Sequence, residues 1–275
     1  MMKKFLFVSL ALLAVACSTS QTKDNDPWGK LSDDVVEKAK EEEAKKSKVV
    51  ELSMYSSVMK QNMTYSLWLP REYDSEKSYP FLYLLHGYEY GDQSRLDRCW
   101  LDKGNAAEIA EKYQKNGGGA MIIVMPNGLS SFYIGDYETY FHEELMPKVE
   151  ADYKGNGKRA IAGLSMGGFG TLWNSTKYPE KFTYAYAMSP ASSWYGMDPK
   201  NNIKSYADKS VFPAFTIEIG TEDMTVNNSD SKSLYSFMIS NGITCELIER
   251  GGTHDWAFWQ ACLPKALAKA DESFK

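Results

Sequence analysis

Ser165 stands between glycines in the stretch AIAGLSMGGFG, residues 160–170. A serine hydroxyl is a poor nucleophile at neutral pH and needs a base within hydrogen-bond reach. The pattern Gly-x-Ser-x-Gly is typical of a nucleophile elbow, in which the serine sits at a sharp turn between a strand and a helix. Glycine and serine are common residues, so the pattern alone is weak, and its meaning depends on the elements that flank it.

The residues around this pentapeptide supply the required setting. Residues 159–163 are a short apolar run that predicts a buried strand, and residues 166–178 have the period of a helix. Ser165 therefore falls at a strand-to-helix junction, and we predict that it is a nucleophile. A similar stretch, GLSSF at residues 128–132, lacks the second glycine, and we interpret it as a plain loop.

The chain has three histidines, so the base can be chosen by elimination. His86 follows an early predicted strand and fits a structural turn. His142 lies on a predicted helix and fits a surface or half-buried position. His254 follows the last predicted strand on a glycine-marked loop and completes the chain order serine, acid, histidine. We predict that His254 is the base.

The third member of the site should be a carboxylate on a loop between Ser165 and His254, where it can hold the imidazole in its productive tautomer. The stretch FTIEIGTEDMTV offers Glu222 and Asp223 directly after a predicted strand. We favour Asp223, with Glu222 as the alternative. The structural alternative is that the carboxylate of either residue only caps the following turn and takes no part in catalysis.

An attacked ester carbonyl develops negative charge on its oxygen, which needs preorganised N–H donors. Met166, the residue after the nucleophile, should supply one donor. The loop after the early strand should supply the other, at Tyr88 in the stretch LLHGYEYG. The predicted site thus combines a nucleophile, a base, an acid and two backbone amides.

Beyond residue 49, short apolar runs alternate with longer amphipathic segments. The predicted strands are residues 63–69, 81–85, 120–125, 159–163, 184–188, 214–219 and 245–249. The predicted helices are residues 105–115, 138–153, 166–178, 230–241 and 255–270. This alternation predicts an α/β fold with a mostly parallel sheet and helices on both faces. Ligands bind at the carboxyl ends of the strands in such sheets, where the site residues are expected.

Composition and charge narrow the function classes. The 275 residues are 43% hydrophobic with a formal net charge of −5, which fits one globular domain. Nucleic-acid binding requires a basic face, so we expect no nucleic-acid partner. The histidines are far apart and form no His-Glu-x-x-His motif, so we expect no metal and no cofactor.

The N-terminus, MMKKFLFVSLALLAVACSTS, combines two lysines with an apolar run too short to span a bilayer. This pattern predicts a signal peptide over residues 1–17. The small residues before Cys17 resemble a bacterial lipobox, which implies lipid attachment at Cys17; an ordinary cleaved signal is the alternative. We expect an exported protein, a periplasmic or outer-membrane lipoprotein of a bacterium, that touches the membrane only through this lipid anchor.

Two further regions follow the predicted signal peptide. Residues 18–48 are polar and charge-rich and predict a spacer, helical from about residue 32. Residues 49–275 form the predicted catalytic domain. The sequence leaves open whether the remaining cysteines are buried free thiols or form one disulfide beside one free thiol: Cys99, Cys245 and Cys262.

Five stretches occur in the order seen in a known esterase family: FLYLLHG, YETYFHEELMPKVEADY, RAIAGLSMGGFG, IEIGTEDM and GGTHDWAFW. From about residue 49 onward the chain resembles the esterases that include S-formylglutathione hydrolase (esterase D), the feruloyl and acetylxylan esterases of carbohydrate esterase family 1, and mycolyltransferases. The resemblance implies an α/β-hydrolase fold and an acyl-enzyme formed by a Ser-Asp-His triad. Matched residue by residue, the triad falls on Ser165, Asp223 and His254, and the oxyanion donors fall on Tyr88 and Met166. The chain departs from many relatives in the loop HGYEYGD, where they carry more glycines.

Aromatic side chains near the predicted site are candidates for binding substrate rings: Tyr90, Trp100, Trp194 and Trp256. Together with the export signal, the resemblance implies a serine esterase that removes feruloyl or acetyl groups from polysaccharide or oligosaccharide. An acyltransferase of the same family is one alternative, because a sugar hydroxyl can intercept an acyl-enzyme as water does. A non-catalytic carbohydrate-binding lipoprotein is another, and the complete set of catalytic residue types argues against it.

Overall fold

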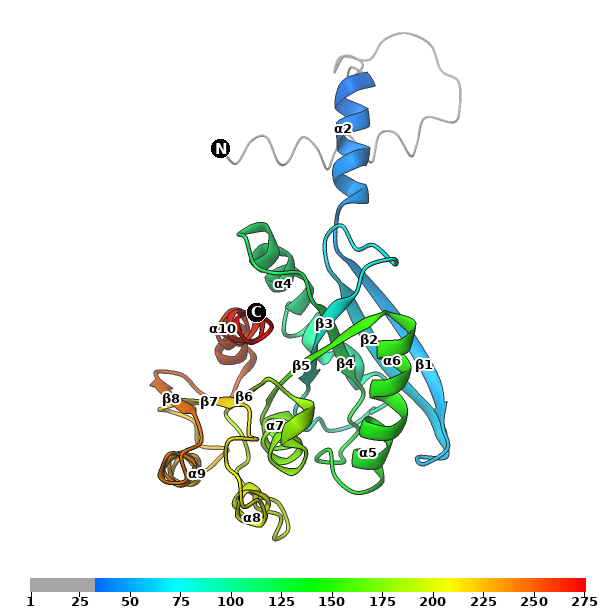
Figure 1. The fold of residues 1–275 in the computed structure, drawn as a ribbon. Helices are drawn as coiled ribbons and strands as arrows, with labels where there is room; N and C mark the ends of the chain where they lie inside the picture. Colours follow the sequence, from blue (N-terminus) through cyan, green and yellow to red (C-terminus); the bar gives the residue numbers. More distant parts are fainter. Residues whose placement is uncertain (1–32) are drawn as a thin grey trace. The chain divides into compact units, whose positions relative to one another are not determined.

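The computed structural model describes residues 33–275, and these divide between two compact units (Figure 1). The first unit ends at Lys46, and its described part holds helix α2 (Asp33–Ala44), which agrees with the helix expected in the spacer. The second unit spans Ser47–Lys275. The predicted signal peptide and the predicted lipidation site Cys17 lie outside the described residues and stay predictions. Within residues 33–275, no helix is both long and apolar enough to cross a membrane.

The second unit is built on one eight-stranded sheet with the order β1-β2-β4-β3-β5-β6-β7-β8. Neighbouring strands from β4 to β8 run parallel, whereas β1 and β2 are antiparallel to their neighbours. The strands are β1 (Lys48–Ser56), β2 (Gln61–Leu69), β3 (Tyr79–Leu85), β4 (Ile122–Pro126), β5 (Gly155–Leu164), β6 (Tyr184–Met188), β7 (Ala214–Gly220) and β8 (Cys245–Arg250). The predicted α/β class with a mostly parallel sheet is confirmed.

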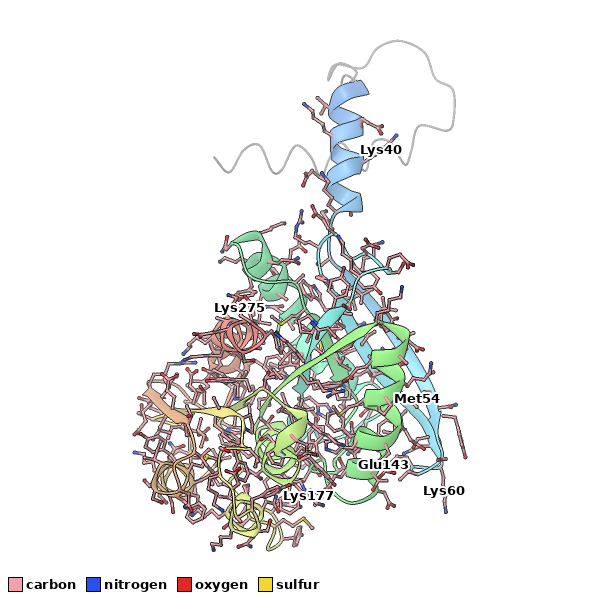
Figure 2. The ribbon with its side chains drawn as sticks, viewed as in Figure 1. Lys40, Met54, Lys60, Glu143, Lys177 and Lys275 are labelled. Carbon is pink, nitrogen blue, oxygen red and sulfur yellow. The ribbon has the colours of Figure 1, made fainter. Side chains whose placement is uncertain are left out.

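Strand β1 is an element that the sequence interpretation missed. It pairs with β2 along its whole length, from Lys48 opposite Leu69 to Ser56 opposite Gln61. Its side chains alternate between exposed and half-buried positions, the pattern of a strand with one face in water. The connecting turn carries Lys60 at the tip of the hairpin (Figure 2), with a φ of 54°.

Helices cover both faces of the sheet, as predicted. They are α3 (Cys99–Asp102), α4 (Ala106–Lys115), α5 (Asp136–Thr139), α6 (Met146–Asp152), α7 (Met166–Lys177), α8 (Pro199–Ser205), α9 (Asn228–Ser240) and α10 (Trp256–Ser273). A π-helical segment, η2 (Tyr140–Leu145), joins α5 to α6, so the helix expected at residues 138–153 is present but underwound in its first half. Helix α8 was not predicted.

The two faces of the sheet bury separate apolar clusters. One cluster joins the sheet to α7 and α9 through side chains such as Phe169, Leu172 and Met238. The other joins it to α4 and α10 through Ala110 and Leu263, and Figure 1 shows these two helices side by side. The sheet is therefore buried on both sides, which explains why its central strands are apolar throughout.

Cys99, Cys245 and Cys262 are free thiols. Cys99 and Cys262 are buried. Burial raises the pKa of the Cys262 thiol to about 12, although Arg250 lies beside it. A protonated buried thiol is unreactive, so these cysteines pack as small apolar side chains.

Candidate active site

Ser165 lies at the turn between β5 and α7, where the sequence placed it. Its backbone has φ 53° and ψ −114°, a conformation that a residue with a Cβ rarely adopts. The Ser165 amide donates to the carbonyl of Met188 at 2.9 Å, and its carbonyl accepts the amide of Phe169 at 3.0 Å. The strained turn is therefore held by the end of β6 on one side and by the first turn of α7 on the other.

Two glycines allow this turn to lie against its neighbours. A Cβ on Gly163 would collide with the backbone of Gly167. A Cβ on Gly167 would come within 2.5 Å of the carbonyl oxygens of Leu85 and His86. Any side chain at these positions would push α7 away from β3 and β5, so the glycines are required by close backbone approach.

A chain of hydrogen bonds joins Ser165, His254 and Asp223. Nε2 of His254 lies 2.9 Å from Oγ of Ser165, and Nδ1 lies 2.7 Å from Oδ2 of Asp223. A carboxylate can only accept, so Nδ1 carries the proton and Nε2 is free to accept the serine hydroxyl proton. The Asp223 side chain is fully buried, while that of His254 is 12% exposed. This arrangement can raise the nucleophilicity of a serine and stabilise the imidazolium that results.

Asp223 is fixed by its own loop. Its Oδ1 accepts the amides of Thr225 at 2.9 Å and Val226 at 3.2 Å, which leaves Oδ2 for the imidazole. The alternative acid, Glu222, points elsewhere: its carboxylate accepts the amide of Gly252, and its own amide donates to the carbonyl of Gly252 at 3.1 Å. The bond from Gly252 lowers the pKa of Glu222. Glu222 thus clamps the loop that carries the base.

The predicted oxyanion donors lie on two segments that meet at Ser165. Met166 is the first residue of α7, where an amide has no intrahelical acceptor. The segment before Tyr88 lies against the nucleophile, because a Cβ on Gly87 would be 3.4 Å from Cβ of Ser165. A helix N-terminus and a neighbouring loop can together bind a developing oxyanion.

His86 fixes the second of these segments and has only 1% of its surface exposed. Its Nε2 accepts the amide of Gly128 at 2.7 Å, so Nδ1 carries the proton and donates to the carbonyl of Gly87 at 2.6 Å. The hydroxyl of Tyr133 donates to the His86 carbonyl at 3.0 Å. Burial lowers the pKa of His86 to about 4. The structural role expected for His86 agrees with these bonds.

His142 lies deeper than the sequence suggested. It sits in η2 with only 7% of its surface exposed. Its Nε2 donates to Oδ1 of Asn174 on α7 at 2.7 Å, and its Nδ1 faces Nζ of Lys181 at 3.3 Å. Burial and then the charge of Lys181 lower its pKa to about 4. The expectation of a surface or half-buried histidine was wrong, because the π-helical segment presents it to α7.

The predicted substrate-binding aromatics fall into different environments. Tyr90 is exposed, and Trp194 is half-buried and stacked on Phe132 with ring centroids 3.6 Å apart. Trp256 is half-buried against Trp100. Trp100 itself is 1% exposed, and its indole donates to the carbonyl of Leu85 at 2.9 Å. The structure corrects the prediction for Trp100: it packs in the core and leaves no ring face for a substrate.

A buried ionic cluster that the sequence did not reveal lies behind the acid and the base. Glu218 on β7 has no exposed side-chain surface and accepts bonds from Tyr186 on β6, Arg250 on β8 and Lys265 on α10. Burial opposes the ionisation of Glu218, but these bonds outweigh it and lower its pKa. Arg250 also donates to the carbonyl of Phe258 at 2.8 Å and lies 3.7 Å from that ring. The two ends of the loop that carries His254 are thus tied together.

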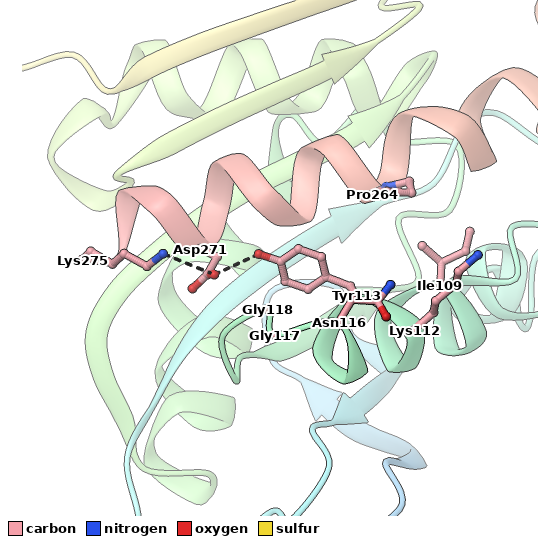
Figure 3. Close-up of a pocket in the computed structure, with 9 residues that line it drawn as sticks. All are labelled: Ile109, Lys112, Tyr113, Asn116, Gly117, Gly118, Pro264, Asp271 and Lys275. Carbon is pink, nitrogen blue, oxygen red and sulfur yellow. Dashed lines mark hydrogen bonds and ion pairs between the residues drawn. The ribbon is translucent and has the colours of Figure 1, made fainter.

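A pocket of about 530 Å³ lies between α4 and α10 (Figure 3). Tyr113 and Asp271 meet in it through a hydrogen bond of 2.9 Å. None of the predicted site residues lines it. In residues 33–275 no group of three or more His, Cys, Asp or Glu side chains could hold a metal ion.

Fold and site together define a class of protein. A serine at a strand-to-helix turn, an imidazole on the loop after the last strand and a carboxylate after the preceding strand are the arrangement of α/β-hydrolases. A family model described as "Putative esterase" matches residues 56–270, so the chain belongs to that esterase family and is a carboxylic ester hydrolase.

Relatives agree with this class. An acetyl esterase from Caldicellulosiruptor saccharolyticus is 27% identical to this chain, and the match covers 80% of this chain and 96% of that protein. An endo-1,4-beta-xylanase/feruloyl esterase from Xylanibacter ruminicola is 25% identical over 79% of this chain, which spans 30% of that longer protein. Among solved structures, a ferulic acid esterase matches with a TM-score of 0.72 and 27% identity, over 83% of this chain and 99% of that one.

Proposed function

We propose that this protein hydrolyses carboxylic esters through an acyl-enzyme on Ser165, and that its substrates are oligosaccharides or polysaccharides bearing feruloyl or acetyl groups. The observation that carries the mechanism is the continuous hydrogen-bonded chain from the Ser165 hydroxyl through His254 to Asp223. Such a chain places a general base on the nucleophile and an acid behind the base.

Acylation follows from this geometry. As Oγ of Ser165 bonds to the ester carbonyl carbon, its proton moves to Nε2 of His254, and the carbonyl electron pair moves onto oxygen. The Met166 and Tyr88 amides bind this oxyanion. Asp223 stays ionised and stabilises the imidazolium. When the carbonyl re-forms, the ester C–O bond breaks, and the leaving alcohol takes the proton from Nε2.

Deacylation repeats the sequence with water. Nε2 of His254 removes a proton from water as the water oxygen bonds to the acyl carbon, and the same two amides bind the oxyanion. Collapse breaks the bond to Oγ of Ser165, which recovers its proton from His254. The products are a carboxylic acid and the free enzyme, and the cycle needs no metal or organic cofactor.

The substrate class is supported by the relatives and by the site. Two of the relatives named above are called a feruloyl esterase and a ferulic acid esterase, and a third is called an acetyl esterase. Trp194, half-buried and stacked on the buried Phe132, offers amphipathic ring surface near Ser165, because Phe132 also packs on Phe169 in the first turn of α7.

A hydrolysis panel tests the proposal. We expect the protein to release ferulate or acetate from acylated xylo-oligosaccharides with a higher kcat/KM than it shows for p-nitrophenyl acetate, since sugar contacts add binding energy in the transition state. The Ser165→Ala variant is the matched control. Hydrolysis of p-nitrophenyl acetate alone would contradict the carbohydrate part of the proposal, and activity that survives in Ser165→Ala would contradict its mechanism.

A further inference from the structure

The edge of the sheet that carries Ser165 also carries the most exposed large apolar side chains of residues 47–275. These are Met224 at 94%, Tyr90 at 90% and Tyr195 at 88% exposed; the next is Tyr55 at 65%. Met224 follows Asp223 directly, and Tyr90 lies two residues after the oxyanion donor Tyr88. Large apolar side chains that protrude together around a site mark a binding surface.

The two tyrosines are the ends of a continuous row of aromatic rings. Centroid distances between successive rings are 5.0 Å from Tyr90 to Tyr88, 6.4 Å from Tyr88 to Phe132, 3.6 Å from Phe132 to Trp194 and 4.8 Å from Trp194 to Tyr195. We call these five rings the aromatic row. Its middle is anchored to the nucleophile helix through Phe169, and its ends extend into solvent. The row therefore passes the first turn of the helix that begins after Ser165, and both of its ends reach solvent.

The loop segments beside Ser165 contain no lysine and no arginine, and Arg95, farther along the loop after β3, pairs with Glu51 and Asp97. These segments are residues 86–92, 127–135, 189–197, 220–227 and 251–257. Their charged side chains are all carboxylates: Glu89, Asp92, Glu222, Asp223 and Asp255. Lys103 reaches the first loop from α3, but its ammonium pairs with Glu89 at 2.9 Å. An anionic substrate would meet like charge here and find no cation to replace its hydration.

These observations together select the chemistry of the bound molecule. A binding surface for anionic lipid requires basic residues beside its apolar ones, and these loop segments have none. Tyrosine and tryptophan rings have apolar faces and polar tips, which suit a ligand made of rings that carry hydroxyl groups. The same loops supply further hydroxyls for hydrogen bonding, at Ser130, Ser193 and Thr253.

Resting on the proposed function, we infer that the aromatic row binds the leaving-group side of an uncharged, multi-ring substrate, and that Tyr90 and Tyr195 determine specificity by binding sugar units beyond the acylated one. The same row discriminates against thioesters of anionic carriers such as glutathione. Because both tyrosines lie outside the hydrogen-bonded chain that performs the reaction, they act on substrate length and leave the reaction at the ester unchanged.

The test compares Tyr90→Ser, Tyr195→Ser and the double variant on a series of acylated xylo-oligosaccharides of two to six sugars, with p-nitrophenyl acetate as the short substrate. Each single variant should lower kcat/KM for the longest oligosaccharides about 3- to 10-fold, the scale of one aromatic contact, and should lower kcat/KM for p-nitrophenyl acetate by less. The matched control is Tyr55→Ser, an exposed tyrosine on β1, three strands or about 14 Å from β3. It should leave both substrates unchanged.

The proposal fails if the tyrosine variants show no dependence on oligosaccharide length, or if p-nitrophenyl acetate hydrolysis falls equally. It also fails if they hydrolyse oligosaccharides normally but lose binding to phosphatidylcholine vesicles, since the row would then serve a lipid surface. Failure of the proposed function looks different: the unmodified protein would then hydrolyse p-nitrophenyl acetate but no acylated oligosaccharide, and the inference would fall with it.

Discussion

The two halves of the active-site edge are built in opposite ways. The acid–base half consists of residues 221–227 and 251–255, and hydrogen bonds cross-link its two segments. Glu222 accepts the Gly252 amide and donates its own amide to the Gly252 carbonyl, and the Thr221 amide donates to the carbonyl of Arg250 at 2.9 Å. Asp223 is buried. The aromatic row ends in tyrosines that are about nine-tenths exposed. Its Trp194 segment is closed mainly on itself, by paired backbone bonds to Met197.

The difference separates chemistry from substrate choice. Proton transfer requires the base to lie within a few tenths of an ångström of its partners, so it is placed on loops that adjacent parallel strands hold in register. Under the proposed function, substrate selection tolerates exposed rings, because each aromatic contact adds a modest amount of binding energy. Loss of the reacting groups in the first half should lower kcat, and changes in the second half should alter only which esters are accepted.

The largest effect should come from the atoms that react. Ser165→Ala removes the nucleophile and His254→Ala removes the base, and each should lower kcat by about 10⁴- to 10⁶-fold. The thermal unfolding midpoint should change little. Steady-state kinetics and calorimetry on the same samples separate the two effects. Retention of more than a hundredth of the activity in either variant would mean that another group does the chemistry.

The two neighbouring carboxylates should differ sharply. Asp223→Asn should lower kcat about 10³- to 10⁴-fold, because an amide favours the wrong imidazole tautomer. Glu222→Gln retains a carbonyl oxygen that can accept the Gly252 amide, so its activity should stay within about threefold of the unmodified protein. Kinetics of this matched pair test the choice of acid directly. A larger loss in Glu222→Gln would reverse the assignment.

The buried Glu218 cluster should affect catalysis by holding the loop that carries His254 in position. Arg250→Met leaves the packing stem but frees the end of the loop that carries His254, and it should lower kcat about 10- to 100-fold with KM changed less than threefold. The matched control is Lys265→Met, which removes the other cation from Glu218 without touching that loop. It should lower the free energy of unfolding but not kcat. Equal losses of kcat in both variants would show a general destabilisation.

The buried histidines outside the triad should make stability fall in acid. His86 and His142 have folded-state pKa values near 4, below the unfolded value of 6.5, so the unfolded chain binds more protons between these values. The free energy of unfolding should therefore fall by up to about 3 kcal/mol for each histidine as the pH falls from 6.5 to 4. Urea unfolding of the protein and of His142→Gln at pH 7, 5.5 and 4.5 measures this. An equal slope in the two proteins would contradict the account for His142.

Much of the site could be chosen from the sequence because α/β folds place catalytic residues at strand ends in a fixed chain order. Ser165, Asp223 and His254 each follow a predicted strand, and the structure brings their side chains within hydrogen-bond distance. Strand β1 was missed although its alternation is visible in KVVELSMYS, because it follows a charged spacer without a turn signal. Trp100 was misassigned because proximity in sequence does not show on which side of a strand a ring packs.

The supporting contacts could not be predicted at all. The Glu218 cluster draws its members from three strands and a helix, whose register only the folded sheet sets. His86 and Gly128 are 42 residues apart, and a histidine that accepts a backbone amide leaves no periodic signal. The aromatic row could not be predicted for the same reason, since it combines rings from three loops that meet only at the carboxyl edge of the folded sheet.

The central claim is that His254 activates Ser165 as a nucleophile. A fluorophosphonate probe measures this directly, because it forms a stable bond only to an activated serine. Peptide mass spectrometry should find one label per molecule, on Ser165, with none in Ser165→Ala and labelling at least about a hundredfold slower in His254→Ala. A folded protein that stays unlabelled at Ser165, or that is labelled there equally fast without the imidazole, would contradict the account.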